Sequence, residues 1–92
     1  MAYRHHGHKV IGTVKAIKGK CSYGHKTGQV LELDAHDAGG LCGFFFYQLF
    51  PYILMLQFGG KFPDSWGGDI ITMDCMDREN TVTIELRPEK QK

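Results

Sequence analysis

The chain has 92 residues, which is the length of one small domain, and its 42% hydrophobic and 23% charged residues are an ordinary composition for a folded protein. We therefore predict a single domain over residues 1–92, with an ordered core from about residue 9 to residue 88. The net charge of +1 creates no strong positive field. On this ground we expect no nucleic acid and no anionic membrane surface as a partner.

The chain divides into strand-like and helix-like segments separated by turns rich in glycine. The clearest strand pattern lies near the C-terminus, where Val82, Ile84 and Leu86 alternate with polar residues and Pro88 is expected to end the strand. Four strands are predicted, at residues 9–17, 29–33, 69–75 and 81–87, and one helical segment at residues 41–58.

The order strand-strand-helix-strand-strand predicts an α+β fold. Two antiparallel hairpins packed against one buried helix satisfy the rule that a domain is built from layers around one core. A small antiparallel sheet that is curled or barrel-like, with the helix across one opening, is the variant of this prediction.

The predicted helix is apolar on nearly all sides, so we expect it to be buried on more than one side. Pro51 interrupts it, because proline removes a helical hydrogen bond and disfavours helix at Phe50. The segment therefore either kinks at Pro51 or divides into two short helices. Its aromatic surface exceeds what four short strands cover, which indicates a homodimer through this aromatic helix. The residues at helical spacing are Phe45, Leu49, Ile53 and Leu56.

The N-terminal segment is polar and lacks the apolar core of a secretory signal. The longest apolar run, residues 44–58, is shorter than the roughly 20 residues that cross a membrane. We therefore expect a cytoplasmic protein, in which disulfides are rare. The three cysteines, an odd number, then supply free thiols or metal ligands.

Cys21 and His25 stand four residues apart in a predicted loop that contains Gly24. A thiolate and an imidazole at this spacing can reach one tetrahedral metal ion. Cys42 and Cys75 complete a set of three cysteines and one histidine if the fold brings them together. The leading prediction is therefore a small metal-binding protein, with zinc or iron held by Cys21, His25, Cys42 and Cys75. The other interpretation of Cys42 and Cys75 is that they are small buried side chains.

Two further functions remain open. Cys42 lies where the helix is predicted to begin, and the positive end of a helix dipole favours a thiolate there. With His25 or His36 nearby, Cys42 or Cys21 would serve a thiol-dependent enzyme or redox protein. The third possibility is a non-catalytic domain that binds a small molecule or a protein through the aromatic helix.

Several motifs in order resemble a family of small uncharacterised bacterial and archaeal proteins. The resemblance runs from about Val10 to Arg87. It implies a short, stand-alone cytoplasmic protein and no activity, so no catalytic residue follows from it. The motifs are Cys21-x3-His25-Lys26-x-Gly28, Gly40-Leu41-Cys42, Leu49-Phe50-Pro51-Tyr52, Phe58-Gly59-Gly60, and Cys75 followed by Asp77 and the strand Val82 to Arg87.

Overall fold

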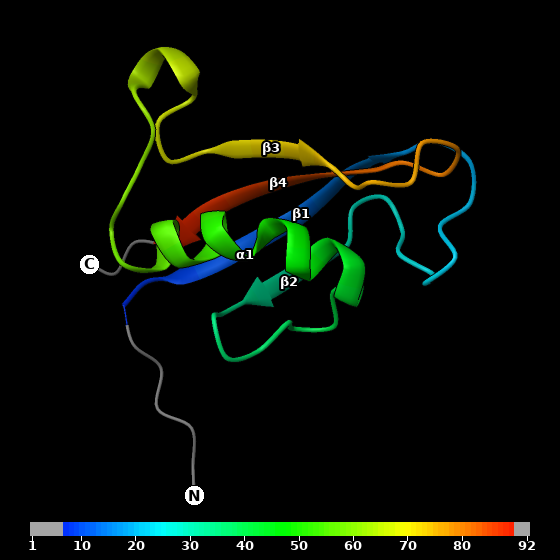
Figure 1. Cartoon of the computed structure of the whole chain (residues 1–92), viewed down its shortest axis with the longest axis horizontal. Helices are drawn as coiled ribbons and strands as arrows, with labels where there is room; N and C mark the ends of the chain where they lie inside the picture. Colours follow the sequence, from blue (N-terminus) through cyan, green and yellow to red (C-terminus); the bar gives the residue numbers. More distant parts are fainter. Residues whose placement is uncertain (1–6, 90–92) are drawn as a thin grey trace, which may run out of the picture.

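The computed structural model describes residues 7–89, and within them the chain forms one antiparallel sheet and one long helix (Figure 1). The order of the elements confirms the predicted α+β fold. The elements are β1 (Lys9–Ile17), β2 (Val30–Leu33), α1 (Gly43–Gln57), a short 3-10 helix η1 (Asp64–Trp66), β3 (Ile71–Asp74) and β4 (Val82–Glu89).

The sheet has the strand order β2-β1-β4-β3, with every neighbouring pair antiparallel. The two central strands are therefore the first and the last of the chain, and each forms a hairpin with an edge strand. In β1 the register shifts between Val14 and Ala16, which is a β-bulge. The β1–β2 loop, the β3–β4 turn and the first residue of α1 lie at the same end of the molecule (Figure 1).

The core lies between α1 and one face of the sheet. The predicted alternation is confirmed, because Val82, Ile84 and Leu86 of β4 are all buried. Gly12 of β1 allows a close approach at the centre, since a Cβ there would lie 3.0 Å from methyl groups of both Leu33 and Ile84. The helix contributes the predicted residues Phe45, Leu49, Ile53 and Leu56 to this core.

The helix differs from the prediction in two respects. It is continuous from Gly43 to Gln57 with Pro51 inside it, so neither separate short helices nor a helix that starts at Pro51 is formed. It is also buried on one side only, because Phe44 and Tyr47 are exposed to 74% and 82%. The expected burial on more than one side is therefore wrong for the single chain, in which only one face of α1 meets the sheet.

The expectation that Pro88 ends the last strand is also wrong, because β4 continues to Glu89. Pro88 is the Cα partner of Val10 in β1. The carbonyl of Val82 accepts the amide of Cys75, and the amide of Val82 donates to the Cys75 sulfur. The even-numbered residues of β4 therefore point their amide nitrogens to the β3 side. Since the pairing of β3 with β4 ends at Ile71 opposite Leu86, proline at position 88 removes no ladder hydrogen bond.

None of the helices among residues 7–89 has the length and apolar character needed to cross a membrane.

Candidate functional site

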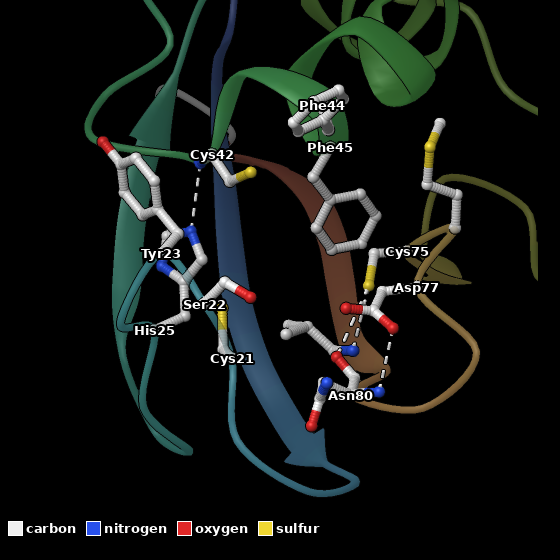
Figure 2. Close-up of a pocket in the computed structure, with 12 residues that line it drawn as sticks. Cys21, Ser22, Tyr23, His25, Cys42, Phe44, Phe45, Cys75, Asp77 and Asn80 are labelled. Atoms are coloured by element: carbon white, nitrogen blue, oxygen red, sulfur yellow. Dashed lines mark hydrogen bonds between the residues drawn. The ribbon is translucent and has the colours of Figure 1, made fainter.

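A pocket of about 290 Å³ lies at the end of the sheet where the β1–β2 loop, the start of α1 and the β3–β4 turn meet (Figure 2). All three cysteines and His25 line it, together with aromatic and polar neighbours. The lining residues are Cys21, Ser22, Tyr23, His25, Cys42, Phe44, Phe45, Cys75, Met76, Asp77, Asn80 and Val82. The structure thus brings together all four residues that were predicted to form a site.

The β1–β2 loop is shaped by glycines and by hydrogen bonds to the bulged end of β1. Gly24 and Gly28 have φ values of 101° and 89°, a backbone conformation that residues other than glycine rarely adopt. The amide of Gly28 donates to the carbonyl of Val14, and the amide of Val14 donates to the carbonyl of Gln29, at 2.8 and 2.9 Å. These bonds hold the C-terminal end of the loop against β1.

His25 is 94% buried, since its exposed fraction is only 6%, and both of its ring nitrogens are hydrogen-bonded. Its Nδ1 lies 2.9 Å from Oε1 of Gln29, which can only accept, so Nδ1 carries the proton. Its Nε2 accepts the backbone N–H of Cys42 at 3.0 Å (Figure 2). The Tyr23 ring stacks on the imidazole with centroids 4.9 Å apart. His25 is therefore a neutral side chain that joins the loop to the start of α1.

Cys42 is the residue that precedes the first turn of α1. Its carbonyl accepts the amide of Phe46 at 2.8 Å, while its thiol makes no capping hydrogen bond. The chain reaches this position through Gly39 and Gly40, both with positive φ. A Cβ at Gly39 would collide with the backbone oxygen of Glu32, so the glycine permits the close passage of the chain beside β2.

Cys75 follows β3 and lines the opposite wall of the pocket. Its sulfur accepts the amide of Val82 at 3.2 Å and lies 3.9 Å from the carbonyl oxygen of Asn80. The turn between these residues is stabilised by Asp77, whose Oδ1 accepts the amides of Glu79 and Asn80. Cys75 is thus half-buried and hydrogen-bonded. It differs in this from a fully buried small side chain without a polar contact, which was the other interpretation of this residue.

The three cysteines stand on different sides of the cavity (Figure 2). Among the residues that the structure describes, no group of three or more histidine, cysteine, aspartate or glutamate side chains is arranged to hold a metal ion. His25 in particular has its two nitrogens engaged by Gln29 and Cys42. A metal at Cys21, His25, Cys42 and Cys75 therefore stays a prediction, and it requires His25 to give up one of these two hydrogen bonds.

The arrangement also bears on thiol chemistry. The His25 nitrogen that would take a proton from the Cys42 thiol instead accepts the backbone N–H of the same residue. His36, the alternative partner, does not line the pocket. It follows the C-terminal end of β2, where its Nδ1 lies 3.6 Å from Oδ1 of Asp34. All three thiols are free within residues 7–89.

Sequence reasoning missed Gln29 and Asn80. Gln29 fixes the proton on His25, and Asn80 accepts the amide of Lys20 at 2.9 Å, which ties the β1–β2 loop to the β3–β4 turn. Asn80 had a usable signal, because an aspartate followed closely by polar residues is typical of a turn capped by its side chain. Gln29 had none, because it belongs to the predicted strand 29–33, where its side chain would be assigned to a sheet face.

No protein-family model, no curated protein and no solved structure matches this chain. The resemblance to the family of small bacterial and archaeal proteins therefore stays a prediction.

Proposed function

We propose that the protein binds a small, mainly apolar organic molecule in the cysteine-lined pocket. The observation that carries this proposal is the convergence of every cysteine in the chain, from three distant segments, on one cavity. Phe44 and Phe45 supply apolar wall, and thiols are polarisable groups that pack well against apolar surface. Small-molecule sites are typically concave, mainly apolar and supplied with few polar groups.

The size of the pocket favours an organic molecule over a bare ion. A tetrahedral metal ion draws its ligands to about 2.0–2.3 Å and leaves no free volume between them. A cavity of about 290 Å³ instead has room for roughly ten groups the size of a water molecule, at about 30 Å³ each. It lies near the lower end of the range of small-molecule pockets, about 300–1,000 Å³.

The test uses 1-hexanol as a small apolar ligand and nitrogen-15 NMR of the whole chain. We expect saturable shifts in residues 21–25, 42–45 and 75–82, which carry the pocket lining. Cys21→Leu fills part of the pocket with a larger side chain and should abolish these shifts. Cys21→Ser leaves the cavity volume nearly unchanged and should retain them. If hexanol shifts no pocket resonance, or if the leucine variant binds it as well as the serine variant, the proposal is wrong.

Metal binding is the second candidate, because the three thiols line a single pocket. In this version Cys21, Cys42 and Cys75 bind zinc or iron, and His25 either leaves its present hydrogen bonds to become a ligand or keeps the Cys42 backbone in place. Native mass spectrometry of untagged protein tests it. One bound metal that is lost in Cys21→Ser would support this candidate, and a folded metal-free chain after zinc or iron addition would reject it.

Three free thiols are compatible with a reducing compartment. We therefore propose the cytoplasm as the site of action, as the sequence predicted.

A further inference from the structure

An open groove adjoins the cysteine-lined pocket on the side of α1. It is lined by Ser22, Tyr23, Cys42, Gly43, Phe44, Tyr47 and Met76. Five of these seven residues also line the pocket: Ser22, Tyr23, Cys42, Phe44 and Met76. The two hollows therefore lie next to each other and share most of the residues that line the groove.

The groove, as lined by these seven residues, presents large apolar side chains and no charged one. Tyr23, Phe44, Tyr47 and Met76 are exposed to 58%, 74%, 82% and 60% of their surface. They come from three segments that are distant in the sequence. A contiguous patch of exposed apolar side chains is typical of a binding site, whereas single exposed apolar residues are normal on any protein surface.

We infer that the ligand is an elongated, uncharged hydrophobic molecule, such as a lipid-like alkyl chain, with one end in the pocket and the remainder along the groove. This inference rests on the proposed function. The adjacency of the two hollows supplies the length. The pocket volume of about 290 Å³ sets how much of the molecule lies in the pocket. Among the described residues that line the two hollows, the one aspartate, glutamate, lysine or arginine side chain is Asp77, which lines the pocket and not the groove. This favours an uncharged tail along the groove.

The experiment compares 1-hexanol, which fits within the pocket, with 1-dodecanol, which does not, both below their solubility limits. Each fully buried methylene contributes about 0.8 kcal/mol, or roughly a fourfold change in Kd. Partial burial of the six additional methylenes should therefore make dodecanol bind at least about tenfold more tightly. Dodecanol should also shift the NMR resonances of Tyr47, which hexanol leaves unchanged.

A pair of variants locates the tail. Tyr47→Ala removes a side chain that lines the groove and not the pocket, so it should weaken dodecanol binding several-fold and leave hexanol binding unchanged. Phe58→Ala is the matched control, because Phe58 is also exposed, at 62%, and lines neither hollow. Since both side chains are exposed, neither variant should unfold the chain.

Equal affinities for the two alcohols, with no effect of Tyr47→Ala, would overturn the elongated ligand and leave the proposed function standing. Failure of both alcohols to bind would overturn both proposals. The alternative to an alkyl chain in the groove is a second copy of the protein chain. A dimer in light scattering that Tyr47→Ala dissociates and dodecanol does not would also overturn the inference.

Discussion

The backbone N–H of Cys42 donates a hydrogen bond to Nε2 of His25 across 3.0 Å and 17 positions of the sequence. The first-turn amides of a helix have no partner within the helix, and α1 has no side-chain cap from its own N-terminal residue. His25 therefore acts as an acceptor next to the start of α1 from a separate loop. This one bond places a predicted metal ligand in a structural role and fixes two walls of the pocket relative to each other.

Replacing His25 with alanine is expected to destabilise the protein by about 1–3 kcal/mol, because it leaves the Cys42 amide without its acceptor in a partly buried position. The variant also loses the stacking of Tyr23 on the imidazole. Urea unfolding measures the change. His36→Ala is the control, since the His36 side chain is 67% exposed and should cost less than His25. Equal losses of unfolding free energy in the two variants would contradict the role of His25 as the acceptor of the Cys42 amide.

Two neighbouring phenylalanines at the start of α1 should respond very differently to truncation. Phe45 is 2% exposed and packs in the core, so Phe45→Ala is expected to cost about 3–5 kcal/mol. Phe44 is 74% exposed, so Phe44→Ala should change the free energy of unfolding by about 0.5 kcal/mol or less. The same urea titration measures both, and a similar cost for both would place Phe44 in an interface within an oligomer.

These two residues also show how much of the fold the sequence contains. Alternation in β4 and the helical spacing of Phe45, Leu49 and Ile53 predicted which side chains are buried, because those periods follow from backbone geometry. The exposure of Phe44 was not predictable, since hydrophobicity alone does not say how many faces of a helix have a partner. The tertiary arrangement of a single four-stranded sheet decides that one face is covered.

The candidate site was predictable as a set of residues and not as a geometry. Cysteine and histidine are recognisable as reactive types, and all four predicted residues do line one pocket. Two of their partners are local, because Gln29 is four positions from His25 and Asn80 is five positions from Cys75. The contact of His25 with the backbone of Cys42 forms only after folding, because it joins two separate loops across 17 positions. No sequence spacing encodes this long-range contact, so the acceptor role of the His25 Nε2 could not be inferred.

Gly39→Ala is expected to be among the more destabilising surface changes. A Cβ at this position would collide with the backbone oxygen of Glu32, so β2 or the following loop must move. Gly28→Ala is the control: its φ of 89° makes alanine unfavourable by about 1–2 kcal/mol, but no atom lies within 4 Å of the new carbon. Thermal unfolding should show a larger loss for Gly39→Ala, and the reverse order would contradict the close passage.

Cys75 is expected to tolerate serine better than alanine. Its sulfur accepts the amide of Val82 at 3.2 Å, and serine retains an acceptor while alanine leaves that amide unpaired. We expect Cys75→Ala to cost about 1 kcal/mol more than Cys75→Ser in urea unfolding. A variant pair in which alanine is equal to or more stable than serine would show that Cys75 acts only as a small apolar side chain.

Pro51 offers a change that should stabilise the protein. It lies inside α1, where it lacks an N–H and is exposed, so its removal sacrifices little packing. A proline in a helix interior is less favourable than alanine by about 3 kcal/mol. Because the native helix has adjusted to its proline, Pro51→Ala should recover part of this, about 1 kcal/mol or more, and raise the urea midpoint.

Leu54→Ala on the same helix is the control. Leu54 is exposed to 39%, and its replacement should not stabilise the protein. A lower midpoint for Pro51→Ala would mean that the proline is required for the native path of α1.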